Sequence, residues 1–265
     1  MKEGDRNTGF FHKQAEARKN FNFVHESQAH DRLINNFEDI KEEAFRHFRE
    51  LFTAQPVIED ADMLHLIPSA VKYNDNESLK QSITMEEIKL AVDSMEEDRA
   101  PGPDGYNVNF IKICWDIIKN DLSKMIKKSQ TCSKIGGSTN SAFLALIPKE
   151  KEAKSFDKFR PISLCNIGYK IITKIMANRL KCILPHLIPK NQGGFVKGRK
   201  IWDNIILVQE AIQSSLKNGD KGMVVKLDLA NAFDRVSHPF LLQLMRRFEF
   251  APEFISWVKA CIDQP

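Results

Sequence analysis

Two aspartates near the C-terminal end are the side chains of this sequence best suited to metal chemistry. Asp228 follows a run of β-forming residues at 223–227, and Asp234 comes directly after the aromatic Phe233. A strand that ends in a carboxylate presents that group on a rigid backbone beyond the sheet edge. Magnesium prefers carboxylate and carbonyl oxygens and keeps waters or substrate phosphates as its other ligands. The alternative is a buried strand that ends in a solvated aspartate, with Phe233 in an ordinary core.

The charge of the chain is distributed unevenly. Residues 36–99 hold 16 acids and 7 bases, whereas residues 100–200 hold 6 acids and 19 bases, a net of +13. A stretch this basic, directly ahead of a candidate metal site, favours a polyanionic partner. The alternative is a set of solvated, lysine-rich helix faces.

Length and composition bound the class of protein. The chain has 265 residues, of which 42% are hydrophobic and 28% charged, and this is typical of a globular protein with one large or two small domains. No apolar run approaches the roughly 18 residues of a membrane span, and the start does not resemble a signal peptide. The five cysteines are scattered without a C-x-x-C pair, which predicts reduced, intracellular thiols and no structural zinc.

Helices account for most of the predicted elements. Apolar residues recur at helical spacing in several stretches, and Thr84 with Glu87 has the pattern of a capping box. Asn166 is predicted to cap one helix, which Pro185 closes, and Gly219 ends another. The predicted helices cover residues 36–52, 84–95, 108–128, 166–183, 201–216, 239–248 and 252–262.

Strands and loops fill the intervals. A short hairpin is predicted within 20–33, and a second one pairs 141–148 with 161–165 across a basic tip. Residues 223–228 are predicted to form a strand. The sequence APGPDG at 100–105 must be a tight turn, because two prolines fix φ and two glycines permit positive φ. Residues 189–199 form a basic, glycine-rich loop.

The basic hairpin, the basic loop and the strand-end Asp228 together resemble the reverse transcriptase of non-LTR retrotransposons (long interspersed elements), particularly the plant type. The resemblance covers almost the whole chain, and its specificity comes from the order and spacing of short motifs. These motifs are GDRNTGFFH (4–12), APGPDG (100–105), LIPK (146–149), FRPISLCN (159–166), QGGFVKGR (192–199) and LDLANAFDRV (227–236).

The resemblance implies an α+β fold, the right-hand polymerase. Residues 1–99 would be a helical N-terminal extension that links to an endonuclease, residues 100–221 the fingers, and residues 222–265 the first half of the palm with an incomplete sheet. The implied activity is that of an RNA-directed DNA polymerase, a nucleotidyltransferase that adds deoxynucleotides to a primer. Its partners would be an RNA template, a DNA primer or target DNA and deoxynucleoside triphosphates, in the nucleus or cytoplasm and without a membrane.

The resemblance also implies roles for single residues. Asp228 would be catalytic and would bridge two Mg²⁺ ions with the main-chain carbonyl of Leu229. Phe233 would lie beneath the nucleotide sugar and exclude a 2′-hydroxyl. Lys149 and Arg160 would bind the triphosphate. The template would be held by Gln192, Phe195 and Arg199.

The residues alone leave other readings open. Without the family, Lys149 is a solvated lysine at a strand end, and Arg160 forms a surface ion pair with Asp157. The family also carries two further acids on a later aromatic-x-Asp-Asp hairpin, whereas this sequence contains no Asp-Asp pair. We therefore expect a fragment that is inactive by itself. A non-catalytic nucleic-acid-binding remnant is the second hypothesis, and a phosphotransferase or hydrolase that uses Asp228 directly is the third.

Overall fold

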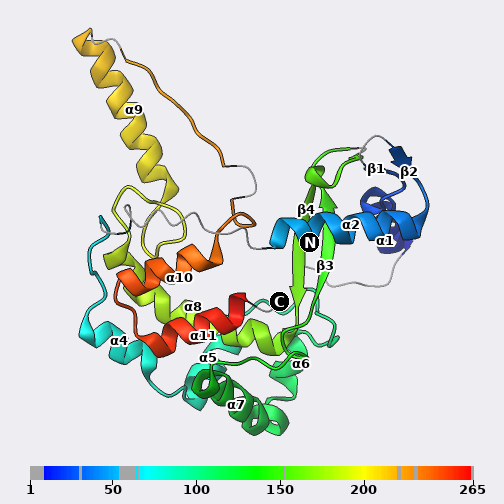
Figure 1. The fold of residues 1–265 in the computed structure, drawn as a ribbon, viewed down its shortest axis with the longest axis horizontal. Coiled ribbons are helices and arrows are strands. Elements are labelled where there is room, and N and C mark those ends of the chain that lie inside the picture. The colour runs from blue at the N-terminus through cyan, green and yellow to red at the C-terminus, as the bar shows by residue number, and fades with distance from the viewer. Residues whose placement is uncertain are drawn as a thin grey trace. The chain divides into compact units, whose positions relative to one another are not determined.

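The computed structural model describes residues 9–29, 32–53, 64, 66–151, 153–219, 222–229 and 232–263. It contains helices and strands, which confirms the mixed fold class, and it divides into two compact units (Figure 1). The first unit comprises residues 1–54 and 142–164, and the second comprises residues 55–141 and 165–265. The predicted motif at 4–12 lies partly outside the described residues, and the predicted domain boundaries stay predictions.

Two small antiparallel pairs and two helices make up the described part of the first unit. Ser27 pairs with Ile34 in the short hairpin predicted within 20–33, and β3 pairs with β4, which confirms the second predicted hairpin. Its elements are α1 (Gly9–Asn22), β1 (Ser27–Ala29), β2 (Arg32–Ile34), α2 (Phe37–Phe52), β3 (Ala142–Pro148), the 3₁₀ turn η1 (Phe156–Lys158) and β4 (Phe159–Cys165).

The core of the first unit joins α2 to the hairpin. Ile40 and Phe48 of α2 are buried together with Phe156 and Phe159, which come from the hairpin tip and the start of β4. The rings of Phe48 and Phe156 meet edge to face with their centroids 6.0 Å apart. An amphipathic helix from the N-terminal region therefore fixes the tip of a hairpin about a hundred residues later in the sequence.

The second unit is helical and is organised around α8. Ile171, Ile172 and Ile175 of α8 are completely buried, and Trp257 of α11 is almost completely buried in the same cluster. The elements of this unit are α4 (Tyr73–Lys80), α5 (Met85–Asp93), α6 (Val108–Ile113), α7 (Trp115–Cys132), α8 (Ile167–Leu187), α9 (Ile201–Asn218), α10 (His238–Arg247) and α11 (Pro252–Ile262).

A partly buried ion pair connects α5 to α8. Thr84 caps α5 as predicted, because its hydroxyl accepts the Glu87 backbone N–H at 3.1 Å. The Glu87 carboxylate binds the Arg179 guanidinium through two contacts of 2.7 Å. Arg179 also donates to the carbonyls of Leu79 and Gln81, both at 2.8 Å. One arginine therefore fixes the α4–α5 connection against α8.

Two predicted helix boundaries are wrong. The helix expected over 108–128 is divided at Cys114, where α6 ends and α7 begins. The Cys114 carbonyl accepts from Ile117 and Ile118, at 3.0 and 3.1 Å, and this starts a new helical turn. Pro185 lies inside the last turn of α8, which continues to Leu187. A proline removes one backbone donor there, but its ring disrupts only the end of the helix.

The strand predicted at 223–228 is absent from the described residues 222–229, which have no regular structure. Their side chains are exposed, with Met223 and Leu227 both at 85%. A strand forms only where a neighbour satisfies its N–H and C=O groups, and no described strand pairs with this segment. It follows α9, a helix with no buried side chain in its length.

None of the helices in the part of the chain that the structure describes is long and apolar enough to span a membrane.

Candidate nucleotide and nucleic-acid site

The hairpin tip holds Lys149 in a defined position. The Lys149 backbone N–H donates to the Lys158 carbonyl at 2.8 Å, and its Nζ donates to the Asp157 carbonyl at the same distance. Arg160 is exposed within β4. The alternative pairing of Arg160 with Asp157 is not found among the described residues, where the Asp157 carboxylate lies 3.8 Å from Nε2 of His47.

Helix α2 supports this tip, a role that the sequence analysis missed. His47 packs against Phe156 with ring centroids 5.9 Å apart, beside the residue whose carbonyl binds Lys149. The hydrophobic face of residues 36–52 was visible in the sequence, but nothing in that pattern identified the hairpin as its partner. The Lys149 ammonium is therefore oriented through η1 by a helix from the N-terminal region.

Arg199 organises the glycine-rich loop from within. Its Nη1 donates to the carbonyls of Pro189 and Gln192, at 2.5 and 2.8 Å, and its Nη2 donates to those of Pro185 and Ile188, at 3.1 and 2.7 Å. Two of these carbonyls lie at the C-terminal end of α8, where a cation also interacts favourably with the helix dipole. The guanidinium predicted to hold template thus binds the loop itself.

The loop brings two predicted site residues into contact. Phe195 has a φ of 62°, in the left-handed region, and its side chain is 90% exposed. Its ring meets that of Phe233 edge to face, with centroids 5.9 Å apart and an interplanar angle of 88°. Gln192 of the same loop is also exposed. A residue predicted to bind template and one predicted to bind the sugar therefore form an accessible aromatic pair.

The two candidate acids do not by themselves make a metal site. Asp228 is exposed and Asp234 is half-buried. The described residues contain no group of three His, Cys, Asp or Glu side chains that could hold a metal ion. The Asp228 carboxylate and the Leu229 carbonyl offer the oxygen ligands that Mg²⁺ prefers, but a site for two ions requires more carboxylates. The described residues alone do not fit the two-ion site.

The APGPDG turn has a structural role that the sequence did not reveal. Asp104 caps α8, because its Oδ2 accepts the Ile167 backbone N–H at 3.0 Å. Asn166 Oδ1 in turn accepts the Asp104 backbone N–H at 2.9 Å, and Asn166 Nδ2 donates to the Ser138 carbonyl at 2.6 Å. Asn166 occupies the N-cap position of α8 as predicted, but its side chain makes no capping hydrogen bond to that helix. An aspartate in a turn is a clear signal for capping, but sequence does not say which helix it caps.

Burial affects two ionisable groups of the second unit. Burial, with a smaller contribution from Cys261, raises the pKa of the Tyr169 phenol to about 12. Burial raises the pKa of the Cys261 thiol to about 12 as well. The Tyr169 hydroxyl donates to the Cys261 carbonyl at 2.9 Å. Both side chains are therefore neutral structural groups near neutral pH.

Comparison with known proteins identifies the class. Residues 147–264, which include most of the hairpin, the loop, Asp228 and Phe233, match the family "Reverse transcriptase (RNA-dependent DNA polymerase)". The chain belongs to the reverse transcriptases. Its relatives further assign it to the reverse transcriptases of non-LTR retrotransposons, as the sequence motifs predicted.

Three relatives illustrate this similarity. The chain is 30% identical over 224 residues to the "Transposon TX1 uncharacterized 149 kDa protein" of Xenopus laevis, which covers 84% of this chain and 17% of that protein. It is 27% identical over 186 residues to the "RNA-directed DNA polymerase from mobile element jockey" of Drosophila melanogaster, an alignment that covers 69% of this chain and 20% of that protein. It is 25% identical over 183 residues to the "Retrovirus-related Pol polyprotein from type-2 retrotransposable element R2DM" of the same species. This alignment covers 69% of this chain and 17% of that protein. The chain thus spans a fifth or less of the length of these relatives.

Proposed function

We propose that this chain forms the fingers and the first half of the palm of an RNA-directed DNA polymerase, a nucleotidyltransferase that extends a DNA primer along an RNA template. The observation that carries the proposal is the family match, which starts in β3 and continues through α11. It contains Lys149, Arg160, Asp228 and Phe233, in the order that the sequence motifs predicted. RNA, primer or target DNA and deoxynucleoside triphosphates are the proposed partners.

The proposed binding roles are those that the sequence motifs predict, and the local geometry of each unit supports some of them. Lys149 and Arg160 bind the triphosphate, and the contact of Lys149 with the Asp157 carbonyl supports a fixed position for its ammonium. Phe233 lies beneath the sugar and excludes a 2′-hydroxyl. Phe195 and Gln192 contact the template from the loop, and the contact between Phe195 and Phe233 supports this arrangement. For Arg199 we propose an indirect role, because it holds the loop in shape.

The metal chemistry is proposed only as far as the residues permit. Asp228 and the Leu229 carbonyl are assigned as ligands of Mg²⁺, which reverse transcriptases require as a divalent cofactor. The remaining carboxylates of a two-ion site are not present as a cluster in the described part of the chain. Residues 1–265 alone should therefore not carry out polymerisation.

Primer extension tests the polymerase proposal. Residues 1–265 alone should give no Mg²⁺-dependent extension, and fusion to a reverse transcriptase palm and thumb segment should restore it. In the fused protein Asp228→Asn should abolish extension, whereas Asp121→Asn, at an exposed position of α7, should not. Phe233→Val should admit ribonucleotides. Extension by residues 1–265 alone, or by the Asp228→Asn fusion, would contradict the assignment.

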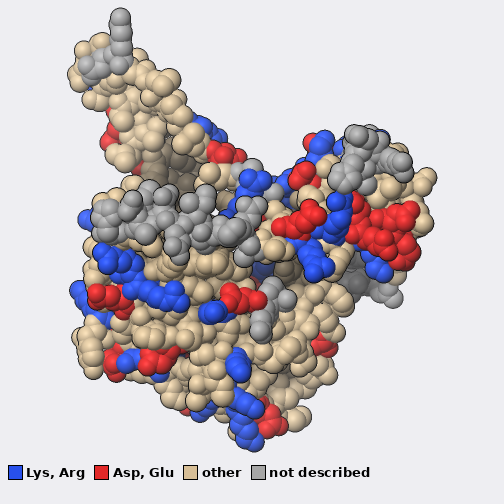
Figure 2. Space-filling model, viewed as in Figure 1, with Lys and Arg blue, Asp and Glu red and all other residues tan. Residues whose placement is uncertain are grey.

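Binding without catalysis is the second candidate function, favoured by the net charge of +13 over residues 100–200. Figure 2 shows that basic and acidic side chains are interspersed on the face in view, so a single positive field does not cover that face. Lys112, for example, pairs with Glu97 at 2.8 Å. The exposed cations of the hairpin and the glycine-rich loop are therefore the ones to test.

The salt dependence of binding tests this candidate. For single strands, log K falls with log salt at about −0.7 per phosphate neutralised. Changing Arg160, Lys190 and Lys197 to Ala should flatten that slope by up to about 2. The control is the same change at Lys41, Lys72 and Lys80 of the acidic stretch 36–99, which should leave the slope unchanged. If the first triple variant retains the full slope, the basic stretch is only a solvated surface.

A further inference from the structure

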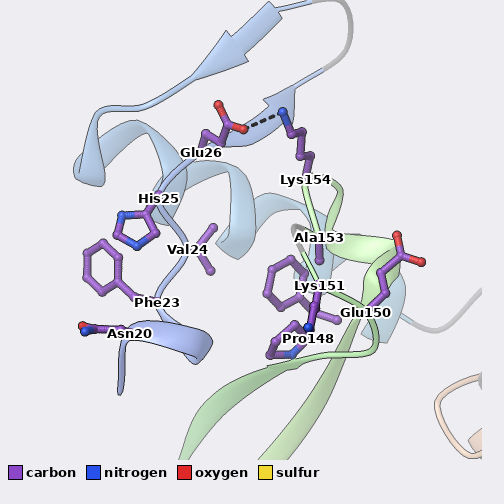
Figure 3. A pocket seen from close by; sticks show the side chains of 11 residues that line it. Asn20, Phe23, Val24, His25, Glu26, Pro148, Glu150, Lys151, Ala153 and Lys154 are labelled. Atoms are coloured by element: carbon purple, nitrogen blue, oxygen red, sulfur yellow. Dashed lines mark ion pairs between the residues drawn. The ribbon is translucent and has the colours of Figure 1, made fainter. Parts of the chain in front are cut away.

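A pocket in the first unit lies outside every residue assigned so far. It has a volume of about 380 Å³ and is formed by the connection between α1 and β1 on one side and the hairpin tip on the other (Figure 3). Because both sides belong to the same compact unit, the pocket is defined without reference to the second unit. Pockets of this size accept small organic groups.

One wall of the pocket is aromatic. The rings of Phe23 and His25 lie 4.8 Å apart at an angle of 58°, and Figure 3 shows them on the side opposite Pro148 and Ala153. Phe23 is 47% exposed, so its face is accessible from solvent, whereas Phe159, which also lines the pocket, is buried. The lining is therefore mostly apolar, with one open aromatic face.

Polar contacts hold the two sides of the pocket together. Lys154 of the hairpin tip forms an ion pair with Glu26 at 2.6 Å, marked in Figure 3, and the Ser27 hydroxyl donates to the Lys154 carbonyl at 3.2 Å. Ser27 is itself buried. These contacts form the pocket before any ligand binds. The Asn20 amide and the Lys151 ammonium add a hydrogen-bonding group and a positive charge to its edge.

We propose that this pocket binds one unpaired base of a single-stranded nucleic acid. The inference rests on the proposed function, and it adds a contact in the N-terminal region to those already assigned. A flat aromatic ring offers stacking to any base, an amide can bind a base edge, and a nearby lysine can bind the adjoining phosphate. Glu26 and Glu150, which also line the pocket, disfavour a small anionic ligand there.

Binding of the full chain to two single strands tests the proposal. One is a fluorescent oligouridylate of about twelve nucleotides, within the usual site size, and the other has the same sugar–phosphate backbone without bases. Phe23→Ala should weaken binding of the base-bearing strand roughly fivefold to a hundredfold, the range for base stacking on an aromatic ring, and leave the abasic strand unchanged. Phe23→Trp, which keeps an aromatic ring at this position, should bind the base-bearing strand as tightly as the wild type does.

The matched control is Phe37→Ala, which removes another exposed phenylalanine of the same unit, at 60% exposure, and should have no effect. As a second measurement on the wild-type chain, a strand that carries 4-thiouridine should cross-link to the peptide that contains Phe23 and His25. An equal loss for both strands in Phe23→Ala, or the lack of a cross-link to the peptide that contains Phe23 and His25, overturns the pocket. If the wild-type chain binds the base-bearing and the abasic strand equally well, the pocket is wrong but the proposed function stands. If it binds neither strand, the proposed function is contradicted as well.

Discussion

Arg179 and Arg199 carry much of the polar order of the second unit, and both act through main-chain carbonyls. Arg179 bridges α8 to the α4–α5 connection, and Arg199 ties the glycine-rich loop to the end of α8. A planar guanidinium carries five donors in a fixed fork, whereas an ammonium carries three on a rotating group. Arg199 was predicted from its motif to bind template, because sequence alone does not distinguish an arginine that binds phosphate from one that binds nearby carbonyls.

Removal of the Arg179 side chain should strongly destabilise the protein. Its side chain is only 9% exposed, and Arg179→Met would leave the Glu87 carboxylate and two carbonyls without their donor. We expect a loss of about 3 kcal/mol in the free energy of unfolding, measured by urea denaturation. Arg46→Met, which removes a surface pair with Glu43, is the control and should change little. Equal effects of the two variants would contradict a structural role for Arg179.

The free energy of unfolding should decrease as the pH rises above about 9, because of Tyr169 and Cys261. Their pKa values rise to about 12 in the folded state, from ordinary values of 10.0 and 9.0. The unfolded chain therefore loses these protons at a lower pH than the folded one, so stability is full below pH 9 and declines between about pH 9 and 12. The double variant Tyr169→Phe with Cys261→Ala should show a shallower decline in urea midpoint. Tyr106→Phe, at an exposed position, should decline as the wild type does.

At the scale of elements, the APGPDG turn and the start of α8 are built as one piece. Asn166 Oδ1 accepts the Asp104 backbone N–H, and Asp104 Oδ2 accepts the Ile167 backbone N–H, across more than sixty residues of sequence. Gly102 lies directly against the backbone between β4 and α8. A Cβ on Gly102 would come within 2.5 Å of the Asn166 nitrogen and of the Cys165 carbonyl carbon. The glycine is required there by close approach, since the backbone leaves no space for a side chain.

Gly102→Ala should therefore destabilise the second unit. The new methyl group would clash with main-chain atoms, which move less easily than side chains, and we expect a loss of about 1–3 kcal/mol or more in thermal or urea unfolding. Gly137→Ala is the matched control, because nothing lies within 4 Å of its Cβ position and its φ is not positive. A Gly102→Ala protein as stable as the Gly137→Ala protein would rule out the close packing of this turn.

Sequence patterns found the elements whose evidence is local. The alternation of turns and apolar runs predicted the β3–β4 hairpin, and the helical spacing of apolar residues predicted α2, α5 and α9. The strand at 223–228 was predicted from β-forming residues alone, but pairing depends on a neighbour that composition does not reveal. The aromatic contact between Phe195 and Phe233 likewise depends on the path of two loops. Motif order predicted the candidate site residues, and both their roles and the assembly of a metal site from them stay predictions.

At the scale of the whole molecule, the described surface includes a long apolar region. Leu207 and Leu216 of α9 are 61% and 74% exposed, and Trp202, at the start of the same helix, is 70% exposed. The segment 222–229 adds Met223 and Leu227, both highly exposed. Surfaces of this kind on a soluble domain are usually covered by another protein surface.

We expect residues 1–265 to self-associate with rising concentration because of this region. Trp202→Glu with Leu207→Lys should shift the protein towards the monomer, measured by sedimentation velocity or light scattering. Ile117→Glu, which changes an 82% exposed residue of α7, outside α9 and the segment 222–229, should not alter association. A wild-type protein that stays monomeric throughout the concentration range would show that the exposed apolar side chains do not drive association.

The division of the first unit between residues 1–54 and 142–164 has a consequence for synthesis on the ribosome. Ile40 and Phe48 leave the ribosome about a hundred residues before Phe156 and Phe159, which cover them in the folded unit. At about 5–20 residues per second, this interval lasts on the order of 5–20 s. During that time α2 is a nascent amphipathic segment without its partner, and the helices of residues 73–132 emerge in between. The first unit therefore completes its fold only after Phe156 and Phe159 have left the ribosome. Until then the apolar face of α2 is accessible to chaperones.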